Sequence, residues 1–143
     1  MVGLQFSLIA ILAIVPIAKP IWQFSIARNF AIAMYFLAIM IFGFAAYALQ
    51  PALSINPIPK TGAPLITVGI YKYLRHPMYL AIMIIATGLL IQKIHPISII
   101  IWLALGANMS LKARYEDSLL NQIHVNAGDY QSKTPDILGK RFD

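Results

Sequence analysis

Residues 69–79 read Gly-Ile-Tyr-Lys-Tyr-Leu-Arg-His-Pro-Met-Tyr and lie between runs of aliphatic residues. Proline disfavours the α conformation in the residue before it and suits the first position of a helix. The stretch therefore predicts a helix that begins at Pro77, with His76 at its cap and Arg75 just outside. A helix N-terminus presents free N–H groups and a partial positive charge. Together with Arg75 and His76, this end favours a carboxylate or a phosphate.

The composition predicts an integral membrane protein. The chain has 143 residues, of which 59% are hydrophobic and 11% are charged, and its mean hydropathy is +0.73. Ordinary globular domains carry about 25% charged residues, so a soluble domain of this length would lack polar residues to cover its surface. The formal net charge is +6. Because the basic residues lie at the ends of apolar runs, we expect them to contact anionic lipid headgroups, not nucleic acid.

The apolar runs predict an all-α bundle of about four transmembrane helices. These runs cover residues 3–18, 30–49, 77–91 and 97–111. No basic segment precedes the first run, which favours a retained anchor over a cleaved signal peptide. In the second run, Gly43, Ala45 and Ala46 form a strip of small residues suited to close helix packing. The last two runs are joined by a short turn, which predicts an antiparallel hairpin.

We expect two parts in the chain, an N-terminal transmembrane hairpin (1–50) and a catalytic core (51–143). Prolines and a glycine between residues 50 and 69 exclude a continuous helix there. Residues 112 to about 125 are predicted as a helix that continues out of the membrane and ends at Asn126 and Gly128, before an irregular tail. Eight Lys and Arg residues lie on the side of the central loop and both termini, against three on the opposite side. This asymmetry predicts that both termini and the central loop are cytoplasmic, in the inner membrane if the source is prokaryotic.

A second polar concentration, Arg114-Tyr115-Glu116-Asp117, lies where the fourth run ends. The predicted hairpin brings it to the level of His76. Tyr79 follows His76 by three residues, so both side chains can face one pocket. An anion-binding helix start, tyrosine rings that attract cations and two carboxylates would suit a zwitterion with an extra cationic centre.

Each of these features also has a purely structural interpretation. Arg and His at the end of a span are often interfacial groups, tyrosines near headgroups often form an aromatic belt, and Glu116 and Asp117 could solvate an exposed helix. The three histidines are scattered, without the spacing of metal ligands, and the sequence has no Gly-rich nucleotide loop. The joint occurrence of both concentrations at one side of a hairpin favours a functional site.

These residues resemble the signature of a known family. Residues 65–79, Leu-Ile-Thr-Val-Gly-Ile-Tyr-Lys-Tyr-Leu-Arg-His-Pro-Met-Tyr, resemble L-V-T-x-G-x-Y-x-x-x-R-H-P-x-Y of the isoprenylcysteine carboxyl methyltransferase and phospholipid methyltransferase family. Arg114, Glu116-Asp117, Tyr130 and Thr134-Pro135 look like the second half of that family's pattern.

The resemblance implies an enzyme that uses S-adenosylmethionine at the cytoplasmic face. It implies a small or lipid-like acceptor, a carboxylate, amine or thiol, that enters from the bilayer. The implied cofactor contacts are Leu65, Ile66, Tyr71, His76, Pro77, Met78, Tyr79 and Glu116, and the implied catalytic residues are Arg114, Glu116 and Asp117. Arg114 would orient a carboxylate acceptor, whereas Glu116 or Asp117 would serve as the base for an amine or thiol.

Two other functions remain open at this point. Membrane sterol reductases that use NADPH carry a similar G-x-Y-x-x-x-R-H-P-x-Y stretch, although those chains are much longer. A non-enzymatic small membrane subunit is the other alternative. The acceptor and the oligomeric state are not determined by the sequence.

Overall fold

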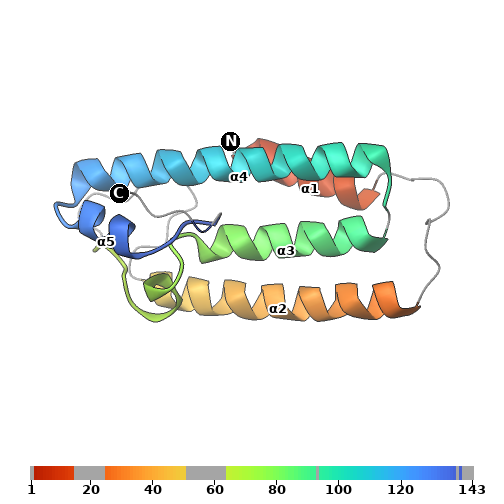
Figure 1. Cartoon of the computed structure of the whole chain (residues 1–143), viewed down its shortest axis with the longest axis horizontal. Coiled ribbons are helices and arrows are strands. Elements are labelled where there is room, and N and C mark those ends of the chain that lie inside the picture. Colours follow the sequence, from red (N-terminus) through yellow and green to blue (C-terminus); the bar gives the residue numbers. More distant parts are fainter. Residues whose placement is uncertain (1, 15–24, 51–63, 93, 138, 140–143) are drawn as a thin grey trace.

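The computed structural model is a bundle of α-helices (Figure 1). It describes the chain except residues 1, 15–24, 51–63, 93, 138 and 140–143. The described residues contain no strand, so the predicted all-α class is confirmed. The elements are α1 (Val2–Ile14), α2 (Ser25–Leu49), a short 3-10 helix η2 (Gly69–Lys72), α3 (Pro77–Gln92), α4 (Pro96–Ile123) and α5 (Ala127–Lys133).

Helix α3 lies between α2 and α4, and α1 lies beside α4 (Figure 1). The predicted antiparallel hairpin of α3 and α4 is confirmed, because the two helices pack together and only a few residues join them. Helix α1 packs against α4 and α3, whereas α2 packs mainly against α3. The division of the chain at residue 50 stays a prediction.

The same dipeptide, His-Pro, starts both helices of the hairpin. Pro77 begins α3, and the carbonyl of His76 accepts the N–H groups of Tyr79 and Leu80. Pro96 begins α4, and the ring Nδ1 of His95 accepts the N–H of Ile97 at 3.2 Å. His95 thus caps its own helix with its side chain, whereas the ring of His76 contacts α4.

Two of the described helices, α2 and α4, are long and apolar enough to cross a membrane. At about 1.5 Å per residue, the 25 residues of α2 extend roughly 38 Å, more than the roughly 30 Å of a hydrocarbon core. Helices α1 and α3, with 13 and 16 residues, are shorter than a straight span. The expectation of four spans is therefore met in length by two helices and stays a prediction for the others.

Small residues allow α2 and α3 to approach each other closely. Ala31, Ala38 and Ala45 are fully buried and recur every seventh residue along α2. On α3, a Cβ added to Gly88 would lie 2.6 Å from Cε1 of Tyr35. The predicted strip is right for Ala45 but wrong for Gly43, where an added Cβ would meet nothing within 4 Å among the described residues. The buried strip has a heptad period, which the local run of small residues did not reveal.

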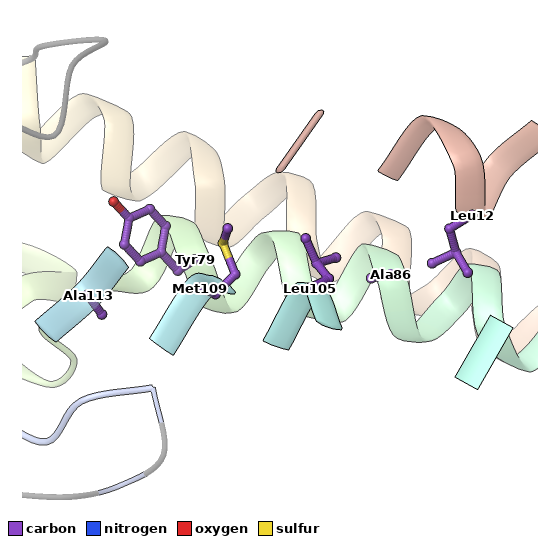
Figure 2. Packing of buried hydrophobic residues seen from close by; sticks show 6 residues of the cluster. All are labelled: Leu12, Tyr79, Ala86, Leu105, Met109 and Ala113. Carbon is purple, nitrogen blue, oxygen red and sulfur yellow. The ribbon is translucent and has the colours of Figure 1, made fainter. Parts of the chain in front are cut away.

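The core that α1 shares with α3 and α4 leads directly to the polar end of the bundle (Figure 2). It consists of Leu12, Tyr79, Ala86, Leu105, Met109 and Ala113. Tyr79 lies beside Ala113 at one end of this row (Figure 2), so its ring packs in the core while its hydroxyl remains available to polar partners.

The chain after residue 111 differs from the prediction in one respect. Helix α4 continues to Ile123, as predicted. The prediction of an irregular tail after Asn126 is wrong, because Asn126 is the N-cap of α5, which runs to Lys133. Helix α5 has only 7 residues, which is too few to show a periodic pattern of hydrophobic residues. Most of the predicted Pro-rich loop lies outside the described residues, and residues 64–68 contain no helix.

Replacing Gly88 by alanine should destabilise the protein by about 1–3 kcal/mol, the range for overpacking a close contact. The Tyr35 ring cannot move away freely, because its hydroxyl accepts a hydrogen bond from Gln92 at 2.9 Å. The measurement is thermal unfolding in detergent.

The matched control is Gly43→Ala, which adds the same methyl group to open space. It should leave the unfolding midpoint unchanged or raise it slightly, because alanine favours helix over glycine. Equal midpoints for the two variants would show that α2 and α3 are not in close contact at Gly88.

Candidate active site

The two polar concentrations meet at the end of the bundle where α3 begins. The start of η2 places the first one there. Gly69 has a φ of +62°, a conformation that favours glycine, and its added Cβ would lie 3.5 Å from Cβ of Ala48 in α2. The second concentration lies on α4, beside the start of α3.

Asp117 is the point at which the two concentrations are joined. Its Oδ2 accepts a hydrogen bond from Nη1 of Arg75 at 2.7 Å, and its Oδ1 lies 3.0 Å from Nε2 of His76. All three residues are buried. The anion that the sequence predicts at the start of α3 is therefore Asp117 itself, a carboxylate supplied by the chain.

Glu116 lies beside this group in a less enclosed position. The hydroxyl of Tyr79 donates a hydrogen bond to Oε1 of Glu116, and Nδ1 of His76 lies 3.6 Å from Oε2. The rings of His76 and Tyr79 are stacked, with centroids 5.4 Å apart and an interplanar angle of 5°. The side chain of Glu116 is 21% exposed, against 6% for Asp117. Of the two carboxylates, Glu116 is thus the one that a ligand can reach.

A buried cation adjoins the tyrosine. Nζ of Lys112 lies 4.8 Å from the centroid of the Tyr79 ring. The same ammonium donates to Oε1 of Gln5 in α1 at 3.4 Å. Lys112 precedes Glu116 by one helical turn, so both side chains lie on one face of α4.

Helix α5 and the segment after it hold this end together. The side-chain amide of Gln131 donates to the backbone carbonyl of Asp117 at 3.0 Å, and the Tyr130 hydroxyl donates to the carbonyl of Tyr71 at 2.6 Å. The backbone N–H of Arg75 donates to the carbonyl of Pro135 at 3.1 Å. Burial and then the charge of Glu116 raise the pKa of Tyr71 to about 12, so this hydroxyl stays protonated at neutral pH.

The structure brings together most of the predicted site residues. Joined by direct contacts are Arg75, His76, Tyr79, Glu116 and Asp117. Tyr71 and Pro77 are buried next to them in sequence, while Leu65, Ile66 and Met78 are half-buried. Arg114 is exposed on α4, outside the buried cluster.

Sequence reasoning did not single out Lys112 and Gln5 as site residues. A signal for each was present. Gln5 is one of two polar residues in the first apolar run, and polar residues in such runs usually face the bundle interior. Lys112 stands one turn before Glu116, at the spacing of an ion pair on one helix face.

The residues present fit a cationic cofactor. The described part of the chain contains no group of three or more acidic or histidine side chains suited to a metal. Tyrosine rings attract positive charge, and the Tyr79 ring is the one that the Lys112 ammonium adjoins. A partly exposed carboxylate, Glu116, adjoins the same ring.

Comparison with protein families gives one match. Residues 30–122 match the Isoprenylcysteine carboxyl methyltransferase (ICMT) family, which is 65% of the chain and includes both polar concentrations. Comparison with curated proteins and with solved structures gives no match.

Replacing Asp117 by asparagine should destabilise the protein by about 3–5 kcal/mol, the range for removing one partner of a buried ion pair. The side chain of Arg75 is only 1% exposed, so its charge would lose this carboxylate without gaining water. Chemical unfolding in detergent measures the change.

The exposed ion pair of Asp129 and Lys133 gives a matched control. Its side chains are 68% and 71% exposed, so Asp129→Asn should cost about 0–1 kcal/mol. A similar loss for the two variants would contradict the assignment of Asp117 as the buried link between α3 and α4.

Proposed function

Because the chain belongs to the isoprenylcysteine carboxyl methyltransferase family, a family of membrane methyltransferases, we propose that it transfers the methyl group of S-adenosylmethionine to a small or lipid-like acceptor. The acceptor, a carboxylate, an amine or a thiol, reaches the site from the bilayer. The protein crosses the membrane several times, and the site and both termini face the cytoplasm.

The observation that carries this proposal is the contact between the two halves of the family's pattern. His76 and Tyr79 from the first half contact Asp117 and Glu116 from the second. This contact joins residues about 40 positions apart in the sequence. It forms a place where aromatic, basic and acidic groups meet at the edge of an apolar bundle.

The two carboxylates have different roles in this proposal. Asp117 is occupied by Arg75 and His76 and serves as a positioning residue. Glu116 is partly exposed and faces the ligand. Since Tyr79 donates to one of its oxygens, the direction of the Glu116 carboxylate is fixed before a ligand binds.

S-adenosylmethionine supplies, when bound, a methyl group on a positively charged sulfur. The chain's own residues align the reactants and keep water away, which are the main contributions that a protein can make to such a displacement. For an amine or thiol acceptor, Glu116 is placed to receive the proton. For a carboxylate acceptor no base is needed.

The exposed side of α4 supports entry of the acceptor from the bilayer. Leu111 and Tyr115 are 57% and 45% exposed there, on either side of Arg114. An apolar surface with one guanidinium group suits a lipid-like molecule with an anionic head. We propose that Arg114 receives the acceptor at this surface, outside the buried cluster.

The purified protein in detergent should bind S-adenosylmethionine and S-adenosylhomocysteine in calorimetry. Glu116→Gln and Tyr79→Phe should each weaken binding at least tenfold. Glu116→Gln removes the negative charge that faces a cationic ligand, and Tyr79→Phe removes the hydroxyl that donates to Glu116. His76→Ala should abolish detectable binding.

Tyr73→Phe is the matched control, since Tyr73 lies in the same stretch but is 71% exposed. It should bind both compounds as the wild type does. Failure of the wild type to bind either compound would refute the proposal. Binding of NADPH, without binding of S-adenosylmethionine, would favour a reductase.

A further inference from the structure

We infer that α1 completes the active site, with Gln5 as a positioning residue that holds Lys112 against Tyr79. Through Lys112, Gln5 sets the preference of the site between a cationic cofactor and its neutral product. This inference rests on the proposed function for the identity of the cofactor, and on the contacts of the chain itself for the role of Gln5.

The three residues form a buried polar contact between three helices. Gln5 is 4% exposed on α1, Lys112 is 6% exposed on α4, and Tyr79 is 8% exposed on α3. Nζ of Lys112 lies 3.4 Å from Oε1 of Gln5 and 4.8 Å from the Tyr79 ring. A buried ammonium needs such partners, because removing it from water is costly.

A partner on α1 helps to keep Lys112 in this place. A lysine side chain is long and flexible, and at the end of a span it tends to extend toward water. The carboxylate of Glu116, one turn further along α4, attracts the ammonium electrostatically, but its oxygens are also close to Tyr79 and His76. Oε1 of Gln5, from another helix, is the acceptor that bonds the ammonium directly.

A fixed ammonium beside Tyr79 affects which ligand charge the site prefers. Two cations near one ring repel each other strongly where water is excluded. Sulfur carries a positive charge in S-adenosylmethionine and none in S-adenosylhomocysteine. Lys112 therefore disfavours the first compound relative to the second, which also favours loss of the charge during methyl transfer.

Helix α1 lies outside the residues that match the family, which begin at residue 30. The contribution of Gln5 is thus a property of this chain's own N-terminal helix. It gives α1 a role in the site in addition to its packing through Leu12.

The first test uses the ligand-free protein. Gln5→Leu removes the acceptor oxygen, whereas Gln5→Glu keeps an oxygen at the same reach. A membrane-permeant amine-reactive reagent, read by peptide mass spectrometry, should label Lys112 at least threefold more in Gln5→Leu than in the wild type. Gln5→Glu should remain at the wild-type level. Lys133, which is 71% exposed, serves as the internal reference.

The second test measures the ratio of the dissociation constants for S-adenosylmethionine and S-adenosylhomocysteine. Lys112→Met should shift this ratio toward S-adenosylmethionine by about fivefold, because a nearby positive charge is removed. Gln5→Leu should shift it in the same direction by about threefold. A looser fold would weaken both compounds alike and leave the ratio unchanged.

A double-variant cycle separates action through Lys112 from an independent effect. In the Lys112→Met background, Gln5→Leu should change the ratio no further. Ser7→Ala, a polar but exposed position on α1, should match the wild type in both tests. Unchanged labelling in Gln5→Leu, or additive shifts in the double variant, would overturn the inference. A wild type that binds neither compound would refute the proposed function and the cofactor preference, and labelling would still decide whether Gln5 holds Lys112.

Discussion

The carboxylate of Asp117 is the group on which the polar end of this molecule depends. A buried negative charge is costly unless hydrogen bonds and an opposite charge compensate it. Here Arg75 and His76 provide both, and they come from the turn that begins α3. The backbone carbonyl of Asp117 accepts a bond from Gln131, so the same residue also fixes α5. The side chain and the backbone carbonyl of Asp117 thus hold the start of α3 and helix α5 against α4.

Adjacent acidic residues on a helix point in directions about 100° apart. This angle lets one residue of the pair hold the fold together while the other stays partly exposed. Asp117 turns toward Arg75, and Glu116 turns toward Tyr79. The arrangement explains why a pair of acids is useful, because a single carboxylate would be fully occupied by its contacts with Arg75 and His76. It also gives His76, whose two ring nitrogens face the two acids, a position from which it couples them.

The sequence was sufficient to predict local features such as helix starts. It also predicted that the two polar concentrations, which are far apart in the sequence, lie close together. Proline chemistry predicted the start of α3, and the short turn before α4 predicted that Asp117 would lie near His76. The contact of Lys112 with Gln5 could not be derived, because it joins residues 107 positions apart whose helices are connected through undescribed segments. The buried face of α2 was also missed, since small residues at Ala31, Ala38 and Ala45 are too widely spaced to form a visible cluster. The sequence did not show which way the Arg114 side chain faces. Arg114 lies on the same helix as Asp117, but it is exposed.

The direct connection between α3 and α4 makes the number of residues in the hairpin a functional quantity. Adding one residue to a helix advances its end by about 1.5 Å and turns it by about 100°. One extra residue inside α3 or the first half of α4 would therefore swing Glu116 into the place of Asp117, or turn both acids away from His76. Exposed side chains along this hairpin can vary in kind without such an effect. The two helices should therefore tolerate changes of exposed side chains better than changes of length, because each added residue moves and turns Glu116 relative to His76.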